Sequence, residues 1–122
     1  MASDAQFLYS VRSRFTNAAT RAEFIGWLAG GHLADVVKAG ALDAELVELE
    51  PERDGSGDAP GDVPGDVPGD VESRYHFASR EAYEAYAAGP AVALRAEGMA
   101  KFPPERGITM TRGFARSVVR VR

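Results

Sequence analysis

Cysteine is absent from this sequence of 122 residues, which excludes disulfide bonds, zinc–thiolate sites and cysteine nucleophiles. Histidine is scarce, with two in the chain, and no cluster of His, Asp and Glu has metal-ligand spacing. No apolar run approaches the roughly 18 residues needed to span a bilayer. Residues 1–5 lack the basic and apolar regions of a signal peptide. We therefore expect a cytoplasmic protein without a metal, a cofactor or a membrane anchor.

The length and the hydrophobic content indicate one small domain over residues 1–122. Hydrophobic residues make up 45% of the chain, which is enough for a core. A domain of this size buries only about two-thirds of its unfolded surface. A partner subunit would therefore help to stabilise it.

An acidic segment interrupts an otherwise mildly basic chain. Between residues 48 and 72 there are nine acidic residues and one basic residue, Arg53, which leaves the rest with a net charge of +4. Three copies of Pro-Gly-Asp-Val stand at residues 60–63, 64–67 and 68–71. We interpret residues 51–70 as a solvated loop inserted in the domain. A calcium site at Asp62, Asp66 and Asp70 is the less favoured alternative, because calcium-binding repeats have longer units and more ligands per turn.

The first half of the chain predicts a strand, a bent helix and a second strand. Asn17 or Thr20 can cap the helix, Gly30-Gly31 should stop or bend it, and Gly40 suits its end. The second strand is expected at residues 42–50. The first strand shows period-two alternation of large apolar residues, namely Phe7, Tyr9, Val11 and Phe15.

The second half repeats this order. A third strand is expected at residues 71–78, followed by a helix that Ser79 caps. Gly89-Pro90 must interrupt this helix, because proline lacks an N–H. The continuation should carry Leu94 and Met99 inward. The last strand is expected at residues 108–121, with Gly113 as a candidate bulge.

This order of elements predicts an α+β fold of the ferredoxin-like β-α-β-β-α-β type, a four-stranded antiparallel sheet with two helices on one face. The first and last strands carry apolar residues on both faces, as Leu8 and Val119 show. An apolar second face is usually buried by another subunit. We therefore expect a homodimer.

Two helical segments and the last strand carry residues in a pattern that occurs elsewhere. These residues are Trp27-Leu28, His32-Leu33, Asp35-Val36, Gly40, Leu94-Arg95-Ala96-Glu97, Ala100-Lys101-Phe102 and Arg112. They resemble the motifs of a bacterial family catalogued as a domain of unknown function, which is similar in fold to the dimeric α+β barrels. The resemblance covers about residues 7–119 without the repeats, and implies two sheets packed face to face.

Barrels of this kind include cofactor-independent monooxygenases, haem-degrading enzymes, small isomerases and proteins without known activity. Gly98 stands where we expect a histidine, so a histidine-pair mechanism is not carried over.

His32 is the best candidate for a catalytic residue. It follows Gly30-Gly31 near the start of a short helical segment, where a helix N-terminus favours the neutral imidazole. A neutral imidazole could act as a general base, and a histidine that holds the bend through a hydrogen bond is the preferred alternative. Trp27 could line a ligand pocket or pack in the core or a dimer interface.

Four further residues are candidates for binding a small anionic or aromatic ligand. Arg12 and His76 could hold a carboxylate if their faces line a barrel interior, or they could lie in exposed or paired positions on the sheet. Arg112 has the same two interpretations. Tyr9 is expected to be a core aromatic residue whose hydroxyl reaches a partner.

Arg112-Gly113-Phe114-Ala115 reproduces the first half of an RNA-recognition signature. The aromatic residues that should follow are missing, so the platform for stacking bases is missing too. Arg116, Arg120 and Arg122 could still contact phosphates. We prefer an edge strand whose charges prevent aggregation, and do not expect a nucleic-acid partner.

Three functions therefore stay open, in this order. The first is a homodimeric binding or structural module. The second is a small-molecule enzyme of the cofactor-independent monooxygenase or isomerase type, with a pocket in each half-barrel, His32 as base, and Arg112 or Arg12 as anchor for an anion. The third is RNA binding through the basic last strand.

Overall fold

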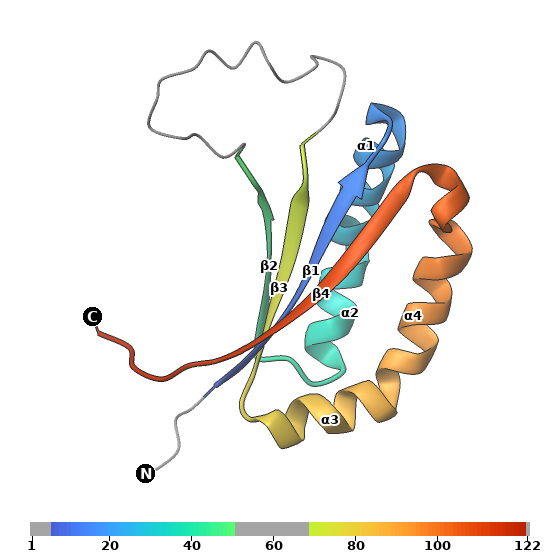
Figure 1. The fold of residues 1–122 in the computed structure, drawn as a ribbon. Helices are drawn as coiled ribbons and strands as arrows, with labels where there is room; N and C mark the ends of the chain where they lie inside the picture. The colour runs from blue at the N-terminus through green and yellow to red at the C-terminus, as the bar shows by residue number, and fades with distance from the viewer. Residues whose placement is uncertain (1–5, 51–68, 122) are drawn as a thin grey trace, which may run out of the picture.

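A computed structural model describes residues 6–50 and 69–121. It contains one antiparallel sheet with the strand order β2-β3-β1-β4, and its helices cover one face (Figure 1). This architecture confirms the predicted α+β fold of the ferredoxin-like type. The elements are β1 (Phe7–Phe15), α1 (Ala18–Trp27), a π-helical turn η1 (Leu28–His32), α2 (Leu33–Lys38), β2 (Asp43–Glu48), β3 (Val71–Phe77), α3 (Arg80–Ala88), α4 (Pro90–Lys101), a 3-10 turn η3 (Pro104–Arg106) and β4 (Ile108–Arg116).

The alternation in β1 and β3 determines which side chains enter the core. Phe7, Tyr9 and Phe15 of β1 are buried on the helix-covered face, as are Tyr75 and Phe77 of β3. Two clusters of buried side chains result. One lies toward α2 and α3 and consists of Phe7, Tyr9, Val36, Ala41, Tyr75, Phe77, Tyr86 and Ala91. The other lies toward α1 and the end of α4 and consists of Phe15, Phe24, Leu28, Val71, Phe102 and Ile108.

The first helical segment begins and bends as the sequence predicts. Asn17 is the cap, since its side chain accepts a hydrogen bond of 2.7 Å from the backbone N–H of Thr20. The helix is kinked within η1, where Gly31 has non-helical backbone angles. α2 ends at Lys38. Gly40 lies in the turn that follows, with a φ of 145° that favours glycine.

The second helical segment is divided at the predicted position. Ser79 caps α3 by accepting a hydrogen bond from the N–H of Ala82. α4 begins at Pro90, which has no N–H to lose at a first helical position. The division lets α3 and α4 follow different directions over the same face of the sheet (Figure 1).

The last strand is shorter than predicted and has no bulge. β4 ends at Arg116 and not at residue 121, because β1 begins at Phe7 and offers no further partner. The last backbone bond joins Ser117 N–H to the carbonyl of Gln6. Gly113 pairs in regular register with Ser10, and a Cβ at Gly113 would lie 2.8 Å from Ser10 Oγ. Close approach of Ser10 therefore explains this glycine.

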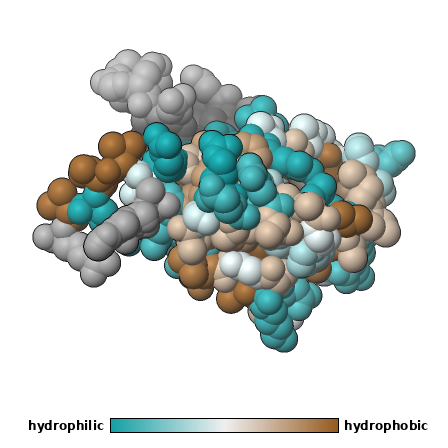
Figure 2. Space-filling view, turned by 90° about the horizontal axis from the view of Figure 1, so that it is seen from below, coloured by the Kyte–Doolittle hydropathy of each residue, from teal (hydrophilic) through white to brown (hydrophobic). Residues whose placement is uncertain are grey.

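Residues 117–121, which we call the arm, continue beyond the sheet on the side away from the helices (Figure 1). The side chains of Val118, Val119 and Val121 are 86%, 77% and 86% exposed. Figure 2 shows hydrophobic atoms projecting from the body of the molecule on the same side as the arm. Val119 therefore belongs to the arm and not to a face of the sheet.

The sheet face without helices, which we call the open face, corrects the prediction of an apolar second face. Leu8 does lie on it, but charged residues dominate it. The side chains of β1 and β3 alternate between the two faces, and most of the charged ones fall on this face. Three ion pairs lie there: Arg12 with Asp70 at 2.8 Å, Arg14 with Asp70 at 3.3 Å and Arg74 with Glu72 at 2.6 Å. His76 is hydrogen-bonded to Asp43 at 2.8 Å on the same face.

Of the repeat segment, only Gly69, Asp70 and Val71 lie within the described residues. The predicted loop at 51–70 and the calcium alternative at Asp62 and Asp66 otherwise fall outside them. Asp70 is hydrogen-bonded to Arg12 and Arg14. Among the described residues, no group of three or more His, Asp or Glu side chains could hold a metal ion.

Candidate functional site

A pocket of about 480 Å³ lies between the helix-covered face of the sheet and the helices α1 and α4. Its size falls in the range of small-molecule sites. It lies between the two buried clusters, because the bent first helix and the divided second helix cover the sheet unevenly. Residues from β1, β3, β4, α1, η1 and α4 line it.

One end of the pocket is a stack of aromatic rings. The rings of Trp27 and His32 are stacked with centroids 4.2 Å apart and an angle of 22° between their planes. Phe102 and Phe24 support Trp27 at centroid distances of 5.5 and 6.0 Å. Such a stack offers a flat apolar surface to a planar ligand.

His32 contributes a polar atom without a partner to this end. Its Nδ1 is buried and has no hydrogen-bond partner among the described residues. Burial lowers the pKa of His32, although the charges of Glu97 and Asp35 oppose the effect. The imidazole is therefore neutral at pH 7, and either ring nitrogen can accept or donate a proton according to the tautomer.

The tyrosines Tyr9, Tyr75 and Tyr86 line the other end. Burial raises the pKa of Tyr75 to about 12, and it raises the pKa of Tyr9 and Tyr86 as well. All three hydroxyls therefore stay protonated and can donate hydrogen bonds. Ser73 adds a buried hydroxyl to the same lining.

Two arginines stand at the solvent side of the pocket. Arg95 comes from α4 and Arg112 from β4, and the charges of both act on Tyr9 by lowering its pKa against the effect of burial. Arg95 donates one hydrogen bond of 2.9 Å to the carbonyl of Ala87. No acidic side chain is among the residues that line the pocket. Met99 and Met110 also line it and are 58% and 42% exposed, so the pocket opens between α4 and β4, and Met99 is less buried than predicted.

Gly98 explains how α4 approaches the aromatic stack. A Cβ at this position would lie 3.1 Å from Cη2 of Trp27, closer than an ordinary contact. The indole therefore occupies the space that a side chain at position 98 would need. A histidine there, as the resemblance leads us to expect, would require Trp27 to move.

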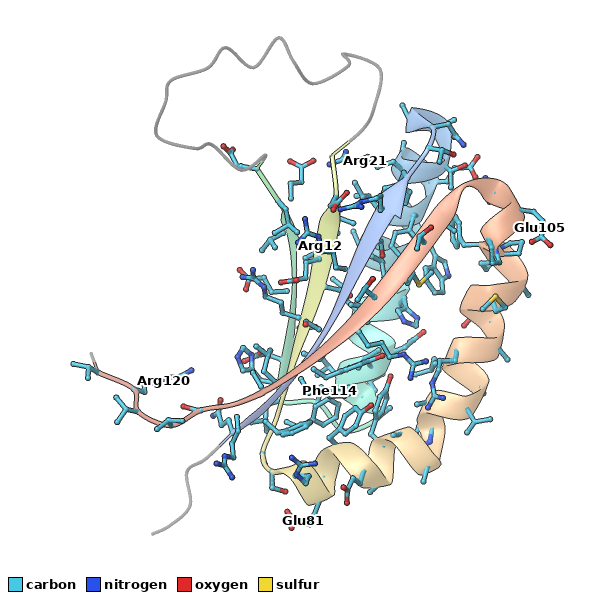
Figure 3. The ribbon with its side chains drawn as sticks, viewed as in Figure 1. Arg12, Arg21, Glu81, Glu105, Phe114 and Arg120 are labelled. Atoms are coloured by element: carbon cyan, nitrogen blue, oxygen red, sulfur yellow. The ribbon has the colours of Figure 1, made fainter. Side chains whose placement is uncertain are left out.

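The structure brings together four of the six predicted site residues. Trp27, His32, Tyr9 and Arg112 all line the pocket. Arg12 and His76 do not line it, because they point to the open face. There Arg12 forms an ion pair with Asp70, and His76 is hydrogen-bonded to Asp43. Figure 3 shows Arg12 on the sheet, apart from α4.

Sequence reasoning did not select Arg95 and Tyr86 as site residues. Leu94, Arg95 and Gly98 stand at helical spacing on α4, so a common face was visible in the sequence. What the sequence did not show was that this face lies over Tyr9 and Arg112, since that contact depends on the division at Gly89-Pro90.

No family model and no curated protein matches the chain. Solved structures do. A dimeric ferredoxin-like protein from an uncultured marine organism is 16% identical with a TM-score of 0.62, covering 96% of this chain and 99% of its own. A monooxygenase from Streptomyces coelicolor, in complex with nanaomycin D, is 17% identical with a TM-score of 0.56, covering 98% of this chain and 95% of its own.

A cofactor-independent oxygenase from Streptomyces nogalater is 18% identical with a TM-score of 0.55, covering 98% of this chain and 97% of its own. At these identities the likeness establishes the fold and nothing more. It confirms the fold that the family resemblance implies.

Within residues 6–50 and 69–121, none of the helices has the length and hydropathy of a membrane-spanning segment.

Proposed function

We propose that this protein is a homodimeric binding module whose pocket takes a small planar aromatic molecule with an acidic group. The observation that carries the proposal is the composition of the pocket: stacked aromatic rings at one end, two arginines at the opening and no acidic side chain in the lining. An arginine near a low-dielectric pocket favours a carboxylate or phenolate. The tyrosine hydroxyls would add hydrogen bonds.

The homodimer is supported by two kinds of observation. The marine protein of the same fold is described as dimeric. The arm also exposes three valines that a monomer would leave in water. The cytoplasmic location and the bacterial source stay predictions from the sequence.

The ligand class is tested with two probes of similar shape, 2-naphthoate and the neutral 2-naphthalenemethanol, by calorimetric titration. We expect 2-naphthoate to bind more tightly. The variant Arg112→Gln should weaken its binding tenfold or more, since a charge-assisted hydrogen bond contributes roughly 1.5–3 kcal/mol, and should change binding of the alcohol little.

Arg116→Gln is the matched control, because Arg116 lies on the same strand and does not line the pocket. It should leave both affinities unchanged. Equal affinity for both probes, or an equal loss in Arg112→Gln and Arg116→Gln, would contradict the proposed role of charge at the opening.

A second candidate function rests on the unpartnered, neutral imidazole of His32 in the pocket. In an enzyme of the cofactor-independent monooxygenase or isomerase type, His32 would remove a proton from the bound molecule. The probe is 2-tetralone, whose acidic C–H bonds exchange with deuterium when a base removes the proton. Exchange catalysed by the native protein and lost in His32→Gln, with 2-naphthoate binding retained, supports this function, and exchange at the buffer rate contradicts it.

A further inference from the structure

We infer that the arm, residues 117–121, pairs with the outer edge of β2 in a second copy of this chain. This inference rests on the proposed homodimer and identifies which segments of the two copies are in contact. The sequence of the arm, Ser-Val-Val-Arg-Val, is rich in β-branched residues, which favour strands, yet beyond Ser117 the arm forms no backbone hydrogen bond within the described part of the chain.

The direction of the arm points to a partner and not to its own sheet. The arm leaves at the end of the sheet where β1 begins, and extends away from the helices (Figure 1). Arg120, labelled in Figure 3, lies on the opposite side of the view from α4. An extended segment of five residues spans roughly 17 Å, and stacked sheets lie about 10 Å apart. The arm is therefore long enough to reach a second sheet packed against the open face.

β2 is the edge that suits this arm. It lies at one edge of the sheet, pairing with β3 only, so the backbone groups of its outer side are free among the described residues. Such an edge accepts an added strand. β2 is also six residues long, which matches a short arm.

Charge selects β2 over the other edge of the sheet. β2 exposes Asp43, Glu45 and Glu48, of which Asp43 and Glu48 already contact His76 and Arg21 within the subunit. The arm carries Arg120 and follows directly on Arg116. The competing edge, β4, carries Arg112 and Arg116, so an arm added there would place arginine beside arginine. Opposite charges across paired strands stabilise the pair, and like charges destabilise it.

The open face is compatible with this arrangement. Its side chains are largely charged and paired within the subunit, so the face alone provides little apolar surface for association. The three exposed valines of the arm provide it instead. Two equivalent arms, exchanged about a two-fold axis, would cover both β2 edges.

The first experiment compares the full chain with a chain that ends at Ser117, by light scattering on a size-exclusion column. Keeping Ser117 preserves its bond to Gln6. We expect the full chain at about twice the 13.0 kDa of one chain and the shortened chain at the mass of one. Circular dichroism and 2-naphthoate binding should show that the shortened chain is folded.

The outcomes separate the inference from the function on which it rests. A shortened chain that is still a dimer would contradict the role of the arm in association but not the proposed homodimer. A full chain that is a monomer overturns both. In either case, binding of 2-naphthoate is measured separately, because all residues of the pocket come from one chain.

A charge exchange tests the position on β2. Arg120→Glu and Glu45→Arg should each weaken the dimer at low salt by about tenfold or more, and the double variant should recover most of the loss. Lys38→Glu and Glu84→Arg, two exposed positions on α2 and α3, are the matched controls and should not affect association. Failure of the double variant to recover would show that the arm does not lie against β2.

Discussion

At the scale of single residues, the shape of the pocket depends on a few positions where an adjacent side chain limits the size of the residue. Gly98 has no side chain and leaves space for the indole of Trp27. Trp27 stacks on the imidazole of His32, and the two rings together form a flat surface of the pocket. The sequence predicted that Trp27 and His32 matter, through their types and their place beside Gly30-Gly31. It did not predict that their rings touch, because that depends on the backbone kink at Gly31, between the two residues.

His32 should make the stability of the protein depend on pH. Its pKa is lowered in the folded state by burial, so the unfolded chain binds a proton more readily. The stability associated with neutral His32 is complete above its unfolded pKa of about 6.5 and is lost as the pH falls through the lower folded pKa.

The measurement is urea unfolding of the native chain and of His32→Gln between pH 8 and pH 5. The native chain should lose stability relative to the variant as the pH falls below about 6.5. The other histidine, His76, is present in both proteins and cancels in the difference. A difference that does not change over this range would show that His32 titrates alike in both states.

At the scale of elements, most strands and helices could be predicted, because their signals are local. The alternation in β1 and the caps at Asn17 and Ser79 each depend on a few neighbouring residues. The end of β4 and the character of the open face could not be predicted in this way. The first depends on where β1 begins, and the second on ion pairs between residues distant in the sequence, such as Arg12 and Asp70.

The turn before β4 offers a prediction about one glycine. Gly107 has a φ of 84°, and a Cβ there would lie 2.1 Å from Thr16 Oγ1. The carbonyl of Gly107 also accepts a bond of 2.8 Å from Thr16 N–H, which joins this turn to the end of β1. Gly107→Ala should destabilise the protein by more than about 1–2 kcal/mol, because it adds a clash to an unfavourable φ.

Gly26→Ala is the matched control, since Gly26 lies within α1 and a Cβ there meets no atom within 4 Å. This change should stabilise the protein by about 0.5–1 kcal/mol. Thermal unfolding followed by circular dichroism measures both. A Gly107→Ala protein as stable as the native chain would contradict the account of the turn.

Asp70 links the start of β3 to β1. Its side chain is 12% exposed. Burial acts to raise the pKa of Asp70, but the hydrogen bonds and charges of Arg14 and Arg12 outweigh it and lower this pKa. The resulting stability is present above the ordinary pKa of 3.8 and is lost as the pH falls through the lower folded pKa.

Asp70→Asn should therefore cost about 0.5–1 kcal/mol at pH 7, a range suited to pairs whose arginines are exposed. The cost should be smaller at pH 2 than at pH 7, and it should shrink at 1 M salt. Chemical denaturation at the two pH values measures it, with Glu84→Gln on α3 as control. An equal cost at both pH values would mean that the charge of Asp70 contributes nothing.

At the scale of the whole molecule, the sheet divides the protein into two surfaces with different chemistry. The helix-covered face contains the pocket, with aromatic rings inside and arginines at the opening. The open face is charged and internally paired, and the arm projects beyond it. Ligand binding therefore belongs to one subunit, whereas association is assigned to the arm, and the two can be altered separately.

The central claim is that the pocket between the sheet and α4 binds a planar aromatic anion. The most direct test is the nuclear Overhauser effect between the ring protons of bound 2-naphthoate and the protein. The chain contains one tryptophan, Trp27, so contacts to its indole can be assigned without ambiguity. If the ligand lies in this pocket, we expect contacts from the naphthalene ring to Trp27 and Tyr9. Contacts confined to the open face or the arm, with none to Trp27, would contradict it.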